Sequence, residues 1–505
     1  MTQTDSTPAP SQDPNAAPPV DAAHRSHLDR SLTRGIAWTG SIKWVTQLLA
    51  WVSTLLVARL LTPEDYGLVG LGGMYLGIVT LLSEFGIGTT IVSMRSLGRD
   101  EHAQINTLAM LFGAMSFLVS CAFAPLLAWF FDAPQLTLVV IAMGTIFLIT
   151  GARVVPQALL QRDMRFKDLA INDGIQSVVL AVGAVLFALL GFRYWTLVLS
   201  AIIGAAFSTI GVLRLQRLPF RWPQWKTLAP AVRFSRQTLM GRFAWYVYQN
   251  ADFFVAGKVL GKASLGAYKV GWDLASSPIE KITGLVSRVT PSILSAAQSD
   301  KAALRRYLLR ITEALALATF PLTIGLGLVA EHVVLLALTE KWRVMIAPLQ
   351  LLSVAAAIRS VTPILPQILT VIGENRRVMR VNVAGAIIMP VAFYIGSHWG
   401  TTGIAAGWLV VYPILIVVPM ALLVFRRIEL PAADYLGALA APLTSVAIMA
   451  GAVWTLRLVY PAAMPQMGRL AADIAVGAVA YGGALLVLHR ERVRALLSVI
   501  RAARS

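Results

Sequence analysis

The stretch VARLLTPEDYGLVGLGGMYLGIVTLLSEFGIGTTIV, residues 57–92, contains two apolar runs that are separated by one polar turn. Pro63 presets the backbone of the turn and Gly67 tolerates tight geometry, so we predict a short connection between two helices. A fainter copy, VAGKVLGKASLGAYKVGWDLASS, begins at Val255, and its Gly266 follows Gly67 by 199 residues. This repeat favours a chain built from two homologous halves, as in many transporters.

The composition around this stretch is that of a membrane protein. Of 505 residues, 57% are hydrophobic and only 13% are charged, against about 25% charged in soluble proteins. Apolar runs near 20 residues recur along the chain, which is the length a helix needs to cross a bilayer core of about 30 Å. The single cysteine, Cys121, excludes a disulfide framework and a cysteine metal cage. We therefore predict an all-α polytopic membrane protein.

The apolar runs predict about fourteen transmembrane helices, with twelve as the alternative count. Six spans in each half predict two lobes related by a pseudo-two-fold axis along the membrane normal, with two further helices at the C-terminus. The expected spans are 36–60, 66–92, 105–130, 136–156, 171–190, 195–213, 238–260, 265–290, 311–331, 345–370, 382–398, 402–424, 436–456 and 469–488.

Loops rich in lysine and arginine alternate along the chain with loops that contain few of them. One set holds 28 of the 43 basic residues and the other holds 8, which predicts cytoplasmic N- and C-termini by the positive-inside rule. This bias also accounts for the net charge of +18 without any nucleic-acid partner. The predicted divisions are a disordered cytoplasmic tail (1–30), an N-terminal six-helix lobe (31–213), a basic cytoplasmic linker (214–237), a C-terminal six-helix lobe (238–424), two additional helices (425–489) and a basic cytoplasmic tail (490–505).

Ionisable residues inside the expected spans are the candidate functional groups, because a charge in the membrane is costly and usually faces a cavity or a partner. Basic residues outnumber acidic ones there, so full pairing leaves positive charge over, and an anionic substrate is its natural counterion. The basic residues are Lys43, Arg153, Arg242, Lys269, Lys281, Arg288 and Arg359, and the acidic ones are Glu84, Asp252, Asp273 and Glu280.

Three expected spans carry polar stripes at helical spacing. On the eighth span, one arc holds five charges and the opposite side holds apolar residues such as Trp272 and Ile279. A helix of this kind lines water, a substrate path or another polar helix. The members of the three stripes are Lys269, Asp273, Glu280, Lys281 and Arg288 on the eighth span, Arg242, Trp245, Gln249 and Asp252 on the seventh, and Lys43, Gln47 and Thr54 on the first. The alternative is that these charges pair across helices or reach the membrane interface.

Enzyme chemistry has little support in the sequence. The six histidines are scattered without metal-ligand spacing, and no phosphate-binding loop or nucleophile elbow is present. We expect no catalytic residue, no metal site and no cofactor other than a coupling ion. Glu84, Asp252, Asp273 and Glu280 are the candidates for coupling to H⁺ or Na⁺, unless neighbouring cations hold them ionised.

Three segments carry a family resemblance: ARLLTPEDYGLVGL (58–71), LLSEFGIGTTIV (81–92) and above all VPQALLQRDMRFKDLA (155–170). They resemble the Wzx-type lipid-linked oligosaccharide flippases, the polysaccharide-transporter branch of the multidrug/oligosaccharidyl-lipid/polysaccharide exporter superfamily. The likeness covers most of residues 30–430. It implies two six-helix lobes around a cationic central cavity and alternating access across the bacterial inner membrane.

The resemblance also implies a substrate and partners. The substrate would be an undecaprenyl-pyrophosphate-linked repeat unit that is moved to the periplasmic leaflet for exopolysaccharide, capsule or O-antigen synthesis. The implied partners are membrane lipids, a polysaccharide polymerase and a chain-length regulator. Candidate substrate contacts are Lys43, Arg242 and Lys281, with Gln47 and Gln249 beside them. The alternatives are a cation-coupled multidrug antiporter of the same superfamily and a membrane glycan polymerase or ligase, which normally has a large periplasmic loop.

Overall fold

The computed structural model describes residues 49–84, 98–163, 165–224, 243–461, 464–490 and 492. Within these ranges the chain is helical and contains no strands, and its helices overlap all fourteen of the segments expected to span the membrane. Lys43, Gln47 and Arg242 lie outside the described residues.

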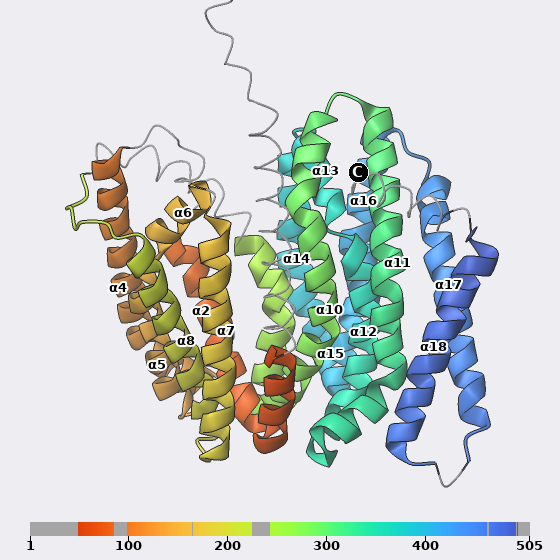
Figure 1. The fold of residues 1–505 in the computed structure, drawn as a ribbon, viewed down its shortest axis with the longest axis horizontal. Helices are drawn as coiled ribbons and strands as arrows, with labels where there is room; N and C mark the ends of the chain where they lie inside the picture. The colour runs from red at the N-terminus through yellow and green to blue at the C-terminus, as the bar shows by residue number, and fades with distance from the viewer. Residues whose placement is uncertain are drawn as a thin grey trace, which may run out of the picture.

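The N-terminal half occupies the left side of Figure 1. It consists of the helix Leu49–Leu60, α2 (Pro63–Glu84), α4 (Arg99–Phe130), α5 (Leu136–Gly151), α6 (Val154–Arg162), α7 (Phe166–Leu189) and α8 (Trp195–Leu215).

The C-terminal half lies beside it, in the centre of Figure 1, and α17 and α18 lie at its far side. It contains a helix over residues 243–255. The remaining elements are η1 (Ala256–Leu260), α10 (Gly261–Ala296), α11 (Lys301–Val333), η2 (Val334–Leu338), η3 (Glu340–Met345), α12 (Ile346–Val361), α13 (Ile364–Val371), α14 (Asn375–Gly396), η4 (Ser397–Trp399), α15 (Gly400–Tyr412), η5 (Pro413–Val417), α16 (Val418–Ile428), α17 (Ala432–Leu458) and α18 (Gln466–Leu488).

Eight helical stretches in the described part of the chain are long and apolar enough to cross a membrane, and α5 with α6 forms a ninth that is bent by 45°. One of the eight, Asn375–Ile428, has 54 residues and folds back on itself. The reversal uses Gly400, whose φ is +69°. On either side of it, Gly396 and Gly403 approach so closely that a Cβ on either would meet the carbonyl oxygen of the other. This stretch therefore contributes two antiparallel helices, α14 and α15.

The polar turn at residues 62–67 starts α2. Asp65 Oδ2 accepts hydrogen bonds from the backbone N–H and the hydroxyl of Thr62, at 2.9 and 2.7 Å. The Asp65 N–H in turn donates to the Thr62 hydroxyl at 3.3 Å. This reciprocal pair satisfies backbone donors that a helix start leaves free. Pro63 occupies the first helical position, where its missing N–H costs nothing.

Gly67 has a different role from the one expected of a turn residue. It lies within α2, where that helix crosses α10. A Cβ at Gly67 would lie 1.7 Å from the carbonyl oxygen of Lys262, and one at Gly266 would lie 1.8 Å from that of Pro63. Two helices can approach this closely only where both lack a side chain. The two contacts are reciprocal and join residues 195 and 203 positions apart, so each lies one helical turn from the 199-residue spacing of the repeat.

Further contacts join the two halves at this same end of the molecule, which is the lower end in Figure 1. The Trp342 indole donates to the carbonyl of Ala58 at 2.9 Å, and Lys341 donates to the carbonyl of Arg59 at 2.6 Å. Lys262 pairs with Glu64 at 3.5 Å. We call the region formed by residues 58–67, 262–266 and 341–342 the closed end.

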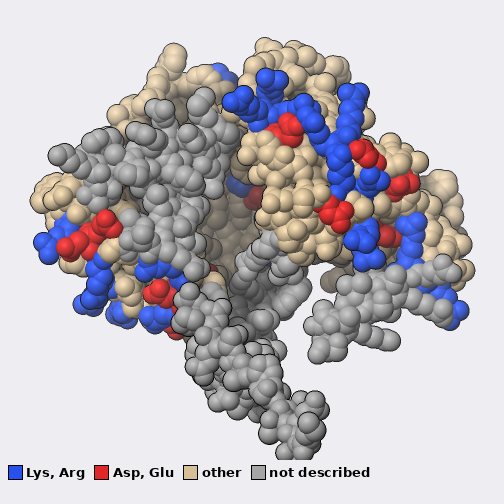
Figure 2. All heavy atoms as spheres, turned by 90° about the horizontal axis from the view of Figure 1, so that it is seen from above, with Lys and Arg blue, Asp and Glu red and all other residues tan. Residues whose placement is uncertain are grey.

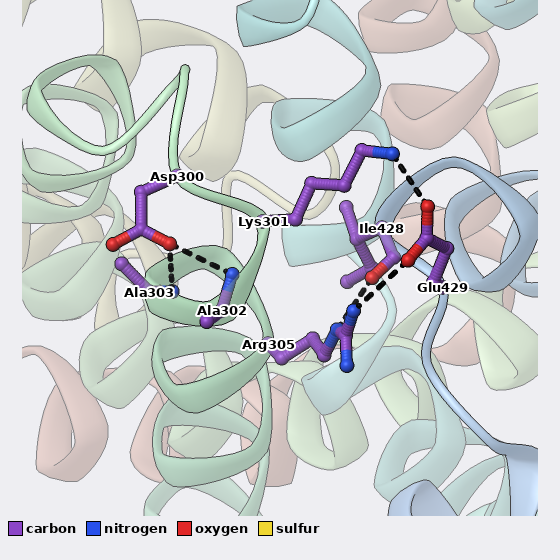
Figure 3. A network of polar contacts seen from close by, with 7 residues as sticks. All are labelled: Asp300, Lys301, Ala302, Ala303, Arg305, Ile428 and Glu429. Atoms are coloured by element: carbon purple, nitrogen blue, oxygen red, sulfur yellow. Dashed lines mark hydrogen bonds and ion pairs between the residues drawn. The ribbon is translucent and has the colours of Figure 1, made fainter.

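The opposite end of the C-terminal half is held by its own polar network (Figure 3). Asp300 caps α11 by accepting from the N–H groups of Ala302 and Ala303. Lys301 pairs with Glu429 at 2.6 Å, and Arg305 contacts the same carboxylate at 3.3 Å. The network ties the start of α11 to the end of α16.

Candidate functional site

The molecule is hollowed between its two halves when seen from above, and charged side chains of both signs are visible inside the hollow (Figure 2). Lysine and arginine gather along the rim of this face. The closed end lies at the opposite end of the molecule. The hollow is therefore accessible from the face that carries the basic loops.

α10 presents a charged face and an apolar face, as its sequence predicts. Trp272 and Ile279 are buried at 9% and 7% exposure, whereas Asp273, Glu280 and Lys281 are exposed. Lys269 forms an ion pair with Asp273 one turn along the helix, at 2.9 Å. Among the described residues, neither Glu280 nor Lys281 has an ion-pair partner within 4 Å. Lys281 is thus a cation available to an anionic ligand.

The stripe expected on the seventh span divides in the structure. Trp245 is 47% exposed and Gln249 is partly buried, whereas Asp252 is 0% exposed. Its carboxylate accepts hydrogen bonds from the Tyr268 hydroxyl at 2.9 Å and from the Trp408 indole at 2.8 Å. Asp252 therefore lies in the interior of the C-terminal half, apart from Asp273 and Glu280. Glu84 ends α2, and its side chain is outside the described residues.

The sequence places Arg359 among the charges inside the expected spans but not among the candidate substrate contacts, whereas in the structure it lines a cavity. Its guanidinium carbon lies 4.1 Å from the centre of the Trp272 ring and 5.0 Å from that of Trp408. It donates a hydrogen bond to Gln249 Oε1 at 3.2 Å. No carboxylate among the described residues lies within 4 Å of it. The sequence indicated this residue only as a single basic side chain in the expected span 345–370. That span has no polar stripe that would have marked the residue as part of a site.

Arg359 and Gln249 line a cavity of about 320 Å³ inside the C-terminal half. The helix 243–255, α10 and the segments from α12 to α16 all contribute to its wall. The wall includes the break between α12 and α13 and the π-helical turn η5, where regular helix hydrogen bonding is interrupted. The lining residues are Trp245, Tyr248, Gln249, Ser276, Ile279, Glu280, Thr283, Arg359, Thr362, Pro363, Pro366, Asn382, Tyr412, Ile416 and Met420.

The described residues contain no group of three or more histidine, cysteine, aspartate or glutamate side chains able to hold a metal ion. The cavity lining offers one cation, one carboxylate, amides, hydroxyls and aromatic rings, all of which can bind a polar ligand.

Comparisons with known proteins agree with this architecture. Residues 56–347 match the family model described as "Polysaccharide biosynthesis protein". The succinoglycan biosynthesis transport protein ExoT of Rhizobium meliloti (strain 1021) is 25% identical over 482 residues, which cover 94% of this chain and 96% of ExoT. The lipopolysaccharide biosynthesis protein WzxC of Escherichia coli (strain K12) is 24% identical, over 75% of this chain and 77% of WzxC.

Two solved structures share the fold. The lipid II flippase MurJ in an inward closed conformation superimposes with a TM-score of 0.73 at 12% identity, over 90% of this chain and all of MurJ. An inward-facing multidrug resistance transporter of the MATE family gives 0.63 at 17% identity, over 76% of this chain and 94% of that one.

Proposed function

Because this chain belongs to the polysaccharide biosynthesis family of Wzx-type transporters, and is a transporter rather than an enzyme, we propose that it moves undecaprenyl-pyrophosphate-linked oligosaccharide repeat units. Movement is from the cytoplasmic to the periplasmic leaflet of the bacterial inner membrane. The products serve the assembly of exopolysaccharide, capsule or O-antigen.

The observation that carries this proposal is the unpaired Lys281 on the polar face of α10, in a molecule that is hollowed between its halves. A pyrophosphate needs cationic donors, and a glycan needs water or polar walls while its lipid stays in the bilayer. A hollow flanked by apolar helices gives the glycan a polar path and leaves the lipid chain in contact with the bilayer. Lys43, Arg242 and Gln47 are further candidates for this wall from their helical spacing.

Alternating access is the proposed mechanism. The hollow opens toward the face with most basic loops, which the positive-inside rule places in the cytoplasm together with both termini. The closed end then faces the periplasm, and its contacts must part for the glycan to leave. The reciprocal contact of Gly67 and Gly266 supports two six-helix lobes related by a pseudo-two-fold axis along the membrane normal.

We propose fourteen spans, and the same geometry supports this count. The long stretch Asn375–Ile428 counts twice because it reverses at Gly400. α10 has 36 residues, ample for a crossing, and we propose that its charged stripe lines the hollow rather than lipid. The coupling ion, H⁺ or Na⁺, would be taken up at Glu84, Asp273 or Glu280. Asp252 would serve only if its two side-chain donors release it.

A multidrug antiporter is the second candidate, because the fold is shared with a MATE transporter. Organic cations require acidic walls. Of the described ionisable side chains on α10 and in the cavity lining that have no ion pair, Lys281 and Arg359 are basic and Glu280 is acidic. This balance favours an anionic substrate.

The test is transport in proteoliposomes. A labelled undecaprenyl-pyrophosphate oligosaccharide is placed in one leaflet, and its appearance in the other is followed for the wild type and for Lys43→Ala, Arg242→Ala and Lys281→Ala. Loss of a charge-assisted hydrogen bond is expected to slow transport about tenfold or more. Lys301→Ala is the matched control, because Lys301 pairs with Glu429 outside the hollow. A wild-type protein that leaves the glycolipid in place and moves organic cations would contradict the proposal.

A further inference from the structure

We propose that the cavity around Arg359 binds one sugar residue of the transported glycan, and not its pyrophosphate. The inference rests on the proposed function and adds a subsite to it, in the C-terminal half and beside the central hollow. The observation behind it is the combination of aromatic rings, amides and one fixed cation in the lining.

The aromatic residues of the lining suit the faces of a pyranose ring. Trp245, Tyr248 and Tyr412 come from two different segments of the wall, and Trp245 is 47% exposed. The C–H-rich face of a sugar packs against an aromatic face with dispersion energy and loses little hydration. An ordinary hydrophobic pocket for a lipid chain would not place polar groups among these rings.

The polar residues of the lining suit sugar hydroxyls, which both donate and accept hydrogen bonds. Gln249 and Asn382 each offer a donor and an acceptor group. The Ser276 hydroxyl is buried, with the residue 5% exposed, and has no hydrogen-bond partner among the described residues. A buried hydroxyl without a partner costs free energy, so a ligand hydroxyl that reaches it gains affinity.

Arg359 is held in one orientation. The stacking contacts with Trp272 and Trp408 and the bond to Gln249 fix its planar guanidinium. A preorganised fork of donors binds a pair of adjacent oxygens with little loss of side-chain entropy. Neighbouring hydroxyls on a ring, or the carboxylate of an acidic sugar, present such a pair.

The charge balance of the lining argues against pyrophosphate. Among the described lining residues Arg359 is the only cation, and Glu280 contributes one carboxylate. A pyrophosphate carries more than one negative charge and needs more than one cation to offset its desolvation. Lys281, next to Glu280 and without an ion pair in the described chain, does not line this cavity, and we assign the pyrophosphate to it instead. A cavity of about 320 Å³ also lies at the lower end of the ligand-pocket range of about 300–1,000 Å³, which suits one ring rather than a whole repeat unit.

The experiment is protection of a single cysteine from a thiol reagent. Cys121→Ser removes the native thiol, and Thr283→Cys places a new one in the lining. Gly284→Cys is the matched control, because Gly284 is the next residue of α10 but does not line the cavity. The protecting probes are the undecaprenyl-pyrophosphate oligosaccharide extracted from membranes of the source bacterium, and undecaprenyl pyrophosphate without a glycan.

We expect the glycolipid to slow labelling at position 283 about tenfold, and the glycan-free lipid to leave it within about twofold of the unprotected rate. Asn382→Ala should weaken protection by about fivefold through loss of a hydrogen bond, whereas Asn375→Ala at the exposed start of the same helix should not. Thermal unfolding of each variant checks that the fold is retained.

Equal protection by the two lipids would overturn the inference, because the pyrophosphate would then occupy the cavity. The inference would also be overturned if the glycolipid did not slow labelling at position 283 in a protein that still transports it. That result would leave the proposed function intact. A folded wild-type protein that does not move the glycolipid would remove the proposed function and this subsite together.

Discussion

Gly67 and Gly266 let α2 and α10 meet backbone to backbone at the closed end. We predict that Gly67→Ala and Gly266→Ala each force the two helices apart, because the new Cβ would lie within 2 Å of a carbonyl oxygen. The expected loss of stability is about 1–3 kcal/mol. Thermal unfolding measures the loss, and reaction of thiols placed at the closed end reports its opening.

Matched controls exist on the same two helices. A Cβ at Gly73 of α2 or at Gly284 of α10 would meet nothing within 4 Å. Gly73→Ala and Gly284→Ala should therefore keep or slightly raise the melting temperature, since alanine favours helices. Equal losses at all four positions would show that helix propensity, rather than close approach, explains the effect.

Spacing along the sequence predicts the positions of some site residues and not of others. The two faces of α10 follow from residue spacing alone, because a helix fixes the angles between its own side chains. Spacing alone does not predict that Asp252 is buried or that Arg359 lines a cavity. Asp252 is hydrogen-bonded to Trp408, and Arg359 stacks on Trp272, and both partners come from other helices. No spacing rule within one span reveals which neighbouring helix it will face. The part of the site assigned to Lys43, Gln47 and Arg242 stays a prediction.

At the scale of elements, α17 and α18 are attached to α11 through a buried acid. Asp473 is 1% exposed and accepts from Arg457 at 2.6 Å and from the Tyr460 hydroxyl. Arg457 also donates to the carbonyl of Leu328 in α11. Asp473→Ala leaves the arginine without its partner and is expected to cost about 3 kcal/mol. The check is a lower melting temperature together with faster proteolysis between α17 and α18.

The control for that change is Asp434→Ala, which removes an exposed acid from the first turn of α17. Its effect should stay within about 1 kcal/mol, the size of a helix-dipole contribution. If Asp473→Ala is as mild as the control, the buried cluster does not hold these helices.

The network of Figure 3 predicts a pH dependence at the opposite end of the C-terminal half. The hydrogen bond from Lys301 holds the pKa of Glu429 below its usual value, and nearby Arg305 acts in the same direction. A lowered folded-state pKa means that the stabilisation is present above the unfolded pKa, about 4.3 for glutamate, and is lost as pH falls through the lower folded value. Glu429→Gln should thus lower the melting temperature slightly at pH 7 and by less near pH 4.

This effect is expected to be small because the pair is exposed to solvent. High salt should reduce the difference between wild type and variant further by screening. A difference that grows as the pH falls from 7 to 4 would contradict the assignment of a stabilising, ionised Glu429.

At the scale of the whole molecule, the all-helical membrane fold was the easiest part to predict. Long apolar runs must become helices in a bilayer, and the loops between them place their ends. The repeat near residue 255 pointed to two halves, and the structure brings Gly67 and Gly266, one residue from each copy, into contact with the other half. The cavity around Arg359 requires at least four separate segments to assemble, so no local pattern predicted it.

The most direct test of the account is to lock the closed end and measure transport. Glu64 and Lys262 pair across the two halves at 3.5 Å, so Glu64→Cys with Lys262→Cys, in a Cys121→Ser background, can be joined by a short thiol cross-linker. Lys301→Cys with Glu429→Cys is the matched pair, because it joins two elements of the same half. Alternating access predicts that the first cross-link stops movement of the undecaprenyl-pyrophosphate oligosaccharide and that cleaving a reducible cross-linker restores it, while the second has little effect. Full transport with the closed end locked would contradict the account.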